Sequence, residues 1–397
     1  MSVSPPQHSA ATEVRIIRPA RSLRGSVMLP GDKSISHRYA MLAGFAEGTS
    51  KIANFSTGAD PYSSLACMRT LGAKVSSEGR TVSVTGTAGR LQQPSSDLDC
   101  GNSGSTMRML AGLVAAQHGT FRFIGDESLT KRPMERIRTP LSSMGARIAL
   151  TDGHAPMTIH GGPLRAIDFE APIASAQVKT AVLFAGLQAQ GTTSLAERVR
   201  TRDHTEHALR AFGASLERRD DRLYIAGGQH LKAADLTVPG DISSAAFFLC
   251  AALLFEDSNL VLDGLGLNPT RASLLDVITG MGGQIKILEV TEAHGEVAGT
   301  VQVNRKASGL KGVDICGALA AQLIDELPVL AAIAPYTRNG TKIRDARELR
   351  VKESDRIAMA FSVAALRADG DTEIRGAESA SISFPEFFDW LDEVAVR

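Results

Sequence analysis

Four segments of the chain share one pattern of hydrophobic and polar positions. Each has an apolar residue and a glycine, followed by two alternating runs around a polar turn: residues 71–86, 144–161, 212–228 and 281–303. A glycine that closes an apolar helical stripe is typical of a helix C-terminus, and alternation with a period of two is typical of a strand. The pattern therefore predicts the end of a helix and then a β-hairpin in each segment.

These segments recur at a nearly constant interval. The spacing is 73, 68 and 69 residues between Gly72, Gly145, Gly213 and Gly282. That interval is long enough for a βαβ unit plus the hairpin. Strand-like runs also alternate with helical patterns, for example at 14–17, 121–124 and 260–262. The chain is therefore predicted to be a pseudo-repeat of modules in the α/β class.

Several predicted helices begin with residues suited to anion binding. Residues 31–48 predict a helix whose first turns carry Lys33, Ser34 and Arg38. Free backbone N–H groups and the positive end of the helix dipole make such a start a site for phosphate or carboxylate. An ordinary capped helix is the better interpretation of one such motif alone. Similar starts recur, however, at 99–110, 174–187 and 239–255, which favours a shared site for a multiply anionic ligand.

Further cations and two adjacent carboxylates occur along the chain. Basic residues cluster at 130–133, 200–204 and 350–356, where arginine can grip a carboxylate or phosphate with two hydrogen bonds. An exposed, salt-bridged face is the alternative for the last cluster. Asp325 and Glu326 directly precede an apolar run. They are interpreted either as a helix cap or as a general base with a tuned pKa.

Composition limits the class of protein. The 397 residues carry 43 basic and 43 acidic side chains, so no overall charge attracts nucleic acid or an anionic membrane. No apolar run approaches the roughly 18 residues of a membrane span, and the first residues do not resemble a secretory signal. The four cysteines have no metal-ligand spacing. We therefore expect two domains, a cytoplasmic location, and no disulfide, metal or cofactor.

The motifs resemble one known family. They occur in the order seen in the 5-enolpyruvylshikimate-3-phosphate synthases: GDKSISHR (31–38), GNSGSTMR (101–108), RP (132–133), SAQVKTA (175–181), TRDHTE (201–206), PGDISSA (239–245), IDELPVLA (324–331), RVKESDRIA (350–358) and SFPEFF (383–388). The likeness runs from about Arg18 to the end. SAQVK and TRDHTE resemble the bacterial variety often called class II.

The resemblance implies an inside-out α/β barrel in each of two domains. Each domain is built from repeated βαβαββ units. One domain comprises 1–31 plus 238–397 and the other 32–237, with the active site in the cleft between them. A monomer is expected.

The resemblance also implies a reaction. The enolpyruvyl group of phosphoenolpyruvate is transferred to the 5-hydroxyl of shikimate 3-phosphate in chorismate and aromatic amino-acid biosynthesis. The matching residues for shikimate 3-phosphate are Lys33, Ser34, Arg38, Ser175, Ala176, Gln177, Arg202, Asp325 and Lys352. Those for phosphoenolpyruvate are Lys33, Asn102, Gly104, Arg132, Gln177 and Arg356. Catalysis is assigned to Lys33, to Asp325 as the base at the hydroxyl, and to Glu353 as the proton donor to the methylene.

The sequence departs from the family near its end. In the family, the KESDR helix is followed by a hairpin and then by a second motif whose arginine also grips phosphoenolpyruvate. Here Arg356-Ile357-Ala358 runs directly into residues that resemble the segment after the second motif. Ile382 also stands where some members carry lysine. The last unit is therefore predicted to be incomplete. Two alternatives arise: a non-catalytic or impaired protein that binds shikimate 3-phosphate, and an enolpyruvyl transferase acting on a sugar nucleotide.

Overall fold

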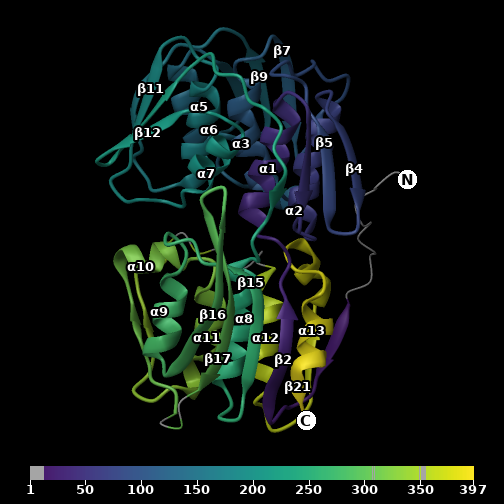
Figure 1. Cartoon of the computed structure of the whole chain (residues 1–397), viewed down its shortest axis with the longest axis vertical. Helices are drawn as coiled ribbons and strands as arrows, with labels where there is room; N and C mark the ends of the chain where they lie inside the picture. Colours follow the sequence, from purple (N-terminus) through teal and green to yellow (C-terminus); the bar gives the residue numbers. More distant parts are fainter. Residues whose placement is uncertain (1–12, 306, 308, 348, 350–354) are drawn as a thin grey trace. The chain divides into compact units, whose positions relative to one another are not determined.

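The computed structural model describes residues 13–305, 307, 309–347, 349 and 355–397. Contacts divide the chain into two compact units (Figure 1). Unit 1 comprises the chain up to Asp32 and from Pro239 onward, and unit 2 comprises Lys33–Val238. Each boundary lies one residue after the expected one. Each unit has its own hydrophobic core.

Unit 2 contains three sheets with the same strand arrangement. Each has a parallel pair of strands followed by an antiparallel hairpin. In sheet order the strands are β14 (Leu236–Thr237), β3 (Thr49–Ala53), β5 (Thr81–Thr85) and β4 (Lys74–Glu78); β6 (Leu98–Asp99), β7 (Gly119–Ile124), β9 (His154–Gly161) and β8 (Arg147–Thr151); and β10 (Asp168–Glu170), β11 (Thr192–Ala196), β13 (Arg222–Ala226) and β12 (Leu216–Arg219). The shared order identifies three copies of one βαβαββ unit.

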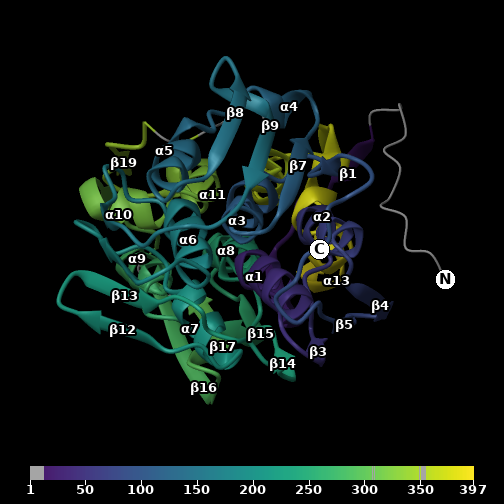
Figure 2. The ribbon, with the colours of Figure 1, turned by 90° about the horizontal axis from the view of Figure 1, so that it is seen from above.

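The sheets of unit 2 surround buried helices (Figure 2). The first helix of each copy is almost wholly buried: α1 (Lys33–Phe45), α3 (Gly104–Val114) and α6 (Ala176–Gly186). The other helices are α2 (Ala59–Thr70), α4 (Glu127–Thr130), α5 (Glu135–Ser143) and α7 (His204–Ala211). Apolar helices inside and half-buried sheets outside give the predicted inside-out arrangement.

The repeated glycines have a common backbone role. Gly72, Gly145, Gly213 and Gly282 have φ angles of 105°, 111°, 87° and 106°. A residue with a Cβ rarely adopts these angles, so glycine allows the chain to leave the helix and enter the next strand. A β-hairpin follows each of them, including β16 (Gly283–Ala293) with β17 (Glu296–Arg305). The prediction from the hydrophobic pattern is confirmed.

Unit 1 begins with one complete copy of the same motif. Its five-stranded sheet has the order β16, β17, β15 (Asn259–Gly266), β2 (Ser22–Met28) and β21 (Ala395–Val396). Its helices are α8 (Ile242–Leu253) and α9 (Ser273–Gly280). Every residue of α8 is buried, which places this apolar helix in the core of unit 1. Among the described residues, no helix is long and apolar enough to cross a bilayer.

The remainder of unit 1 has much smaller sheets. β18 (Asp314–Ile315) pairs only with β19 (Lys342–Ile343), and β1 (Val14–Ile17) pairs only with β20 (Thr372–Arg375), among the described residues. The helical segments are α10 (Gly317–Gln322), α11 (Leu327–Ile333), η1 (Ala334–Tyr336), α12 (Arg356–Ala365), η2 (Ala377–Ile382) and α13 (Phe387–Val394). In the described part of unit 1, no hairpin follows β17. This agrees with the predicted incomplete last unit.

Candidate functional site

The predicted anion-binding residues of unit 2 lie at the starts of its buried helices. Lys33 is the first residue of α1, and its Nζ lies 3.1 Å from Asp60 Oδ2. Both side chains are mostly buried. Because Asp60 holds the ammonium group at the N-terminus of α1, Lys33 adds a positive charge to a helix end that already favours an anion.

Ser34 accepts hydrogen bonds from two arginines. Arg38 Nη1 donates to the carbonyl oxygen of Ser34 at 2.7 Å, and Arg202 Nη1 donates to Ser34 Oγ at 3.4 Å. Arg38 also donates to Thr180 Oγ1 at 2.9 Å and to Thr205 Oγ1 at 2.7 Å. Arg38 is buried, so these bonds fix the start of α1 against α6 and α7.

A second group surrounds the start of α3. Arg132 Nη2 donates to Asn102 Oδ1 at 2.7 Å and to Ser128 Oγ at 3.0 Å. A Cβ on Gly104 would lie 3.3 Å from the guanidinium nitrogens of both Arg132 and Arg108. Glycine therefore leaves space in front of two arginines, as close approach of an anion to the backbone requires.

Gln177 connects this group with the start of α6. Its Oε1 accepts a hydrogen bond of 2.8 Å from Arg108 Nη1, and its Nε2 donates to Ser105 Oγ at 2.9 Å. Ser175 is the N-cap of α6 and accepts from the backbone N–H of Val178. Ala176 is the first residue of that helix. The structure thus brings the predicted residues from α3 and α6 together.

A buried histidine in α1 lies close to this positive charge. His37 Nδ1 lies 2.7 Å from Ser64 Oγ. Burial, with the nearby charges of Lys33 and Arg38, holds the pKa of His37 well below its usual value. The imidazole of His37 is therefore neutral near pH 7 and adds no positive charge beside the cations at the start of α1.

Unit 1 contains a separate group of buried charges. Arg356, the first residue of α12, lies with Nη1 3.3 Å from Asp325 Oδ1. Burial opposes the charge on Arg356, but the carboxylates of Asp325 and its acidic neighbours outweigh burial and raise the pKa of the guanidinium. Asp325 therefore has a cationic partner inside unit 1.

Glu326 differs from its neighbour Asp325 because one of its carboxylate oxygens, Oε1, is engaged inside unit 1, while the other, Oε2, is buried without a hydrogen-bond partner among the described residues. Arg271 Nη2 donates to Glu326 Oε1 at 3.0 Å, and Ser243 Oγ donates to the same oxygen at 2.6 Å. Both charged side chains of this pair are buried. Glu326 is thus a structural ion-pair partner, and Asp325 is the more exposed of the two adjacent carboxylates.

Asp241 has an unusual environment at the start of α8. It caps the helix by accepting from the backbone N–H of Ser243 at 2.7 Å. Burial and the neighbouring Asp32 raise the pKa of Asp241 to about 6, although Arg271 and Arg356 oppose the shift. The sequence predicts a helix start at 239–255 but does not indicate the shifted pKa.

Two predicted residues lie outside the described part of the chain, namely Lys352 and Glu353. Conversely, sequence analysis missed Asp60, Arg108 and Arg271. Arg108 belongs to the GNSGSTMR motif, so its position in the same motif as Asn102 and Gly104 was an available signal. Asp60 and Arg271 are far in sequence from their partners, Lys33 and Glu326, so only the folded structure shows these contacts. Among the described residues, no group of histidine, cysteine and carboxylate side chains is arranged to hold a metal ion.

One family model matches most of the chain. The model of the EPSP synthase (3-phosphoshikimate 1-carboxyvinyltransferase) family matches residues 17–359 and 355–391. The two matches share residues 355–359, so the same short segment aligns with two places in the family. This double match is the result that a deletion between two similar motifs produces.

Relatives match nearly the whole chain. A 3-phosphoshikimate 1-carboxyvinyltransferase from Koribacter versatilis is 53% identical, with 96% of this chain and 99% of the relative covered. One from Solibacter usitatus is 49% identical with the same coverage. The first alignment has 424 positions, 27 more than this chain has residues, so the relative contains a segment without a counterpart here.

Solved structures are also similar. EPSP synthase from Acinetobacter baumannii has a TM-score of 0.87 at 34% identity, covering 97% of this chain and 99% of that one. The enolpyruvyl transferase NikO from Streptomyces tendae has a TM-score of 0.76 at 19% identity, covering 97% and 98%. The second likeness concerns the fold alone. Both agree with the predicted fold class.

Proposed function

Because the chain belongs to the EPSP synthase family, we propose that it transfers the enolpyruvyl group of phosphoenolpyruvate to the 5-hydroxyl of shikimate 3-phosphate and releases phosphate. The observation that carries the proposal is the convergence, in unit 2, of three helix starts with Lys33, Arg132 and Gln177. Both substrates are polyanions, and a site of this composition is suited to them.

Shikimate 3-phosphate binds at the starts of α1 and α6. Lys33 and Arg202 supply positive charge, and Ser34, Ser175, Ala176 and Gln177 supply hydrogen bonds. Arg38 holds Ser34 and the start of α7, as its three bonds inside unit 2 indicate. Asp325 and Lys352 complete the contacts from unit 1.

Phosphoenolpyruvate binds at the start of α3. Arg132, with Asn102 beside it, contacts the phosphate or carboxylate, and Gly104 leaves the space for close approach. Lys33, Gln177 and Arg356 also contact this substrate. Positive charge from several segments offsets the repulsion between the anionic groups of the two substrates.

The reaction requires a proton to leave the 5-hydroxyl and a proton to reach the methylene carbon. Asp325 accepts the hydroxyl proton, and Glu353 donates to the methylene. The hydroxyl oxygen then bonds to the adjacent carbon and forms a tetrahedral adduct that carries a methyl group. Glu353, now a carboxylate, takes a proton back from this methyl group as the carbon–oxygen bond to phosphate breaks, which restores the double bond of the product. The hydroxyl proton held by Asp325 leaves with the phosphate. Arg356 lies 3.3 Å from Asp325 and orients this carboxylate for its role as base. The enzyme acts as a cytoplasmic monomer.

The direct test is phosphate release from the purified chain with both substrates. Release that needs both shikimate 3-phosphate and phosphoenolpyruvate supports the proposal. Binding of shikimate 3-phosphate without phosphate release would instead identify an impaired homologue. Release with a uridine-linked amino sugar and not with shikimate 3-phosphate would identify a sugar-nucleotide transferase.

Calorimetry with Arg132→Ala tests the assignment of the two substrates. The binding free energy of phosphoenolpyruvate, measured with shikimate 3-phosphate present, should become less favourable by roughly 1.5 to 3 kcal/mol. The reason is the loss of one charge-assisted contact. Affinity for shikimate 3-phosphate alone should be unchanged. Lys33→Ala should weaken both. Wild-type binding by both variants would show that these cations lie outside the site.

A further inference from the structure

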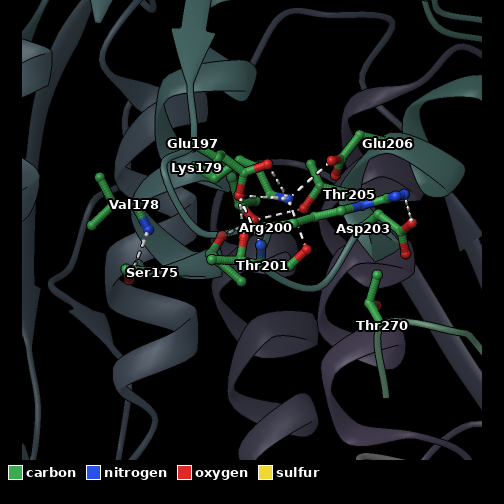
Figure 3. A network of polar contacts seen from close by, with 12 residues as sticks. Ser175, Val178, Lys179, Glu197, Arg200, Thr201, Asp203, Thr205, Glu206 and Thr270 are labelled. Carbon is green, nitrogen blue, oxygen red and sulfur yellow. Dashed lines mark hydrogen bonds and ion pairs between the residues drawn. The ribbon is translucent and has the colours of Figure 1, made fainter. Parts of the chain in front are cut away.

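A buried lysine in α6 has no assigned role. Lys179 follows Gln177 by two residues, and its side chain is only 1% exposed. Its Nζ lies 2.9 Å from Glu206 Oε1 and 3.2 Å from Glu197 Oε1, between the two carboxylates (Figure 3). Arg218 contacts the same carboxylates at 3.0 and 3.2 Å. Lys179, Glu197, Glu206 and Arg218 form a charge-balanced group, which we name the buried quartet.

The buried quartet determines the path of one loop. Glu197 is the first residue after β11, and α7 begins at His204, so residues 197–203 form the connection. Glu197 Oε1 accepts from the backbone N–H and the Oγ1 of Thr201 at 3.1 and 2.5 Å. Lys179 Nζ also donates to the carbonyl oxygen of Thr201 at 3.5 Å. Thr201 is thus fixed from both its N–H and its carbonyl side.

The residue after Thr201 is Arg202, which reaches Ser34 at the start of α1. The same stretch of α6 is connected to that point by a second route. Thr180, the neighbour of Lys179, lies with its Oγ1 2.6 Å from Thr205 Oγ1, and Arg38 donates to both hydroxyls. Lys179 therefore holds the loop just before Arg202 in the sequence, at Thr201, and Thr180 holds α7 just after it, at Thr205.

The electrostatics favour a role in geometry over one in stability. Burial opposes ionisation of Glu197, but the charge of Lys179 and the bonds from Thr201 and Arg218 outweigh it and hold the pKa of this carboxyl below its usual value. Desolvation of buried charges offsets most of their mutual attraction, so apolar replacements of a whole ion pair are often neutral for stability. Apolar side chains cannot, however, replace the directed contact with Thr201.

We infer that Lys179 is a positioning residue for binding of shikimate 3-phosphate: through the buried quartet it holds the 197–203 loop so that Arg202 faces the substrate's anionic group. This inference rests on the proposed function. Lys179 does not touch the substrate, and its effect is transmitted through Thr201 and Glu197.

The test is the charge-balanced variant Lys179→Met with Glu206→Gln. It removes one positive and one negative charge, and Arg218 remains paired with Glu197. The variant should fold, with a thermal midpoint within a few degrees of the wild type. Its Kd and KM for shikimate 3-phosphate should rise about 10-fold or more, and kcat should change less than about 3-fold. Hydrogen exchange of the 197–203 loop without ligand should become faster.

Arg198→Gln is the matched control. Arg198 lies in the same loop and pairs with Glu170, but its side chain is 79% exposed, so its loss should leave binding and loop exchange unchanged. A purely structural role for Lys179 would lower the folded fraction and the apparent kcat at constant KM. Unchanged loop exchange or wild-type affinity in the double variant would overturn the inference alone. A wild-type chain that does not bind shikimate 3-phosphate would overturn both the inference and the proposed function.

Discussion

At the scale of single residues, proton transfer is assigned to two carboxylates, Asp325 and Glu353. Asp325 lies 3.3 Å from Arg356 and is a quarter exposed, whereas Glu353 lies outside the described residues. Asp325→Asn and Glu353→Gln should each lower turnover by roughly 100-fold or more, the usual effect of losing a positioned proton-transfer group. Steady-state phosphate release measures this effect.

A control distinguishes proton transfer from loss of the site. The affinity for shikimate 3-phosphate should fall less in Glu353→Gln than in Asp325→Asn, because Asp325 is assigned to contact that substrate. Glu386→Gln, a change at a carboxylate with no assigned role, should retain turnover. Near-normal turnover in Asp325→Asn or Glu353→Gln would remove that residue from the mechanism.

Asp241 predicts a specific dependence of stability on pH. Its pKa of about 6 in the folded chain exceeds the value near 3.9 expected when unfolded. Between these values the folded state binds more protons, so the free energy of unfolding falls as pH rises from about 4 to about 6. Asp241→Asn retains the helix cap but cannot ionise. Its free energy of unfolding relative to wild type should therefore increase by about 1 to 3 kcal/mol over that range.

Denaturant unfolding at several pH values measures this difference. Asp257→Asn, which changes an exposed carboxylate of unit 1, is the control and should differ from wild type by the same amount at each pH. Asp32, Arg271 and Arg356 remain in both proteins, and because Asp32 interacts with Asp241, the difference measures the ionisation of this pair. A constant difference between Asp241→Asn and the wild type would contradict the assigned ionisation.

Residue types and order predicted many candidate site residues but not how they are held. Lys33, Arg132 and Gln177 lie in motifs whose residue types indicate anion binding. The partners that fix them come from distant positions, such as Asp60 and Arg108. Such contacts arise from the packing of α1, α2, α3 and α6, which periodicity along one segment does not specify. The local sequence pattern therefore indicates which residues can bind an anion, and tertiary packing determines which side chains hold them in place.

At the scale of elements, the hairpins of unit 2 end in glycines that contact a helix. A Cβ on Gly161 would lie 2.0 Å from the carbonyl oxygen of Gln117. The other two copies are equally close: a Cβ added to Gly86 would lie 2.1 Å from the Ala46 carbonyl oxygen, and one added to Gly227 would lie 1.6 Å from that of Ala189. The backbone of each second hairpin strand therefore packs directly against the chain just after α1, α3 or α6.

Gly161→Ala should accordingly destabilise unit 2. The added methyl group meets backbone atoms, which cannot rotate away, so we expect a loss of roughly 2 to 4 kcal/mol in the free energy of unfolding. Gly162→Ala is the neighbouring control, because a Cβ there has no atom within 4 Å. Equal denaturant midpoints for the two variants would show that the strand shifts without penalty.

The elements themselves were more predictable than this contact. The glycines that close the helices are visible as a repeat because each is followed by alternation, and four hairpins lie where the pattern predicts them. Gly86, Gly161 and Gly227 carry no such local signal. Their requirement arises from the closeness of a strand to the end of a helix, which is a property of the assembled βαβαββ unit.

At the scale of the whole molecule, the two units differ in completeness. Unit 2 has three four-stranded sheets, whereas the described part of unit 1 has two sheets of only two strands beside its five-stranded sheet. The shared match of residues 355–359 places the missing segment at the start of α12. Phe361 on that helix is 58% exposed, as expected where a covering element has been lost.

Unit 1 should therefore be less stable than unit 2, because a missing hairpin leaves short strands with unpaired edges and apolar side chains with less cover. Hydrogen exchange should show weaker protection of β18, β19 and α12 than of the sheets of unit 2. Insertion of the corresponding segment of the Koribacter versatilis relative between Arg356 and Ala358 should raise both this protection and turnover. A Gly/Ser insertion of equal length should raise neither. Equal protection of the two units, with turnover that the insertion does not improve, would show that the shortened unit is complete for folding and that Arg356 alone is sufficient at its position.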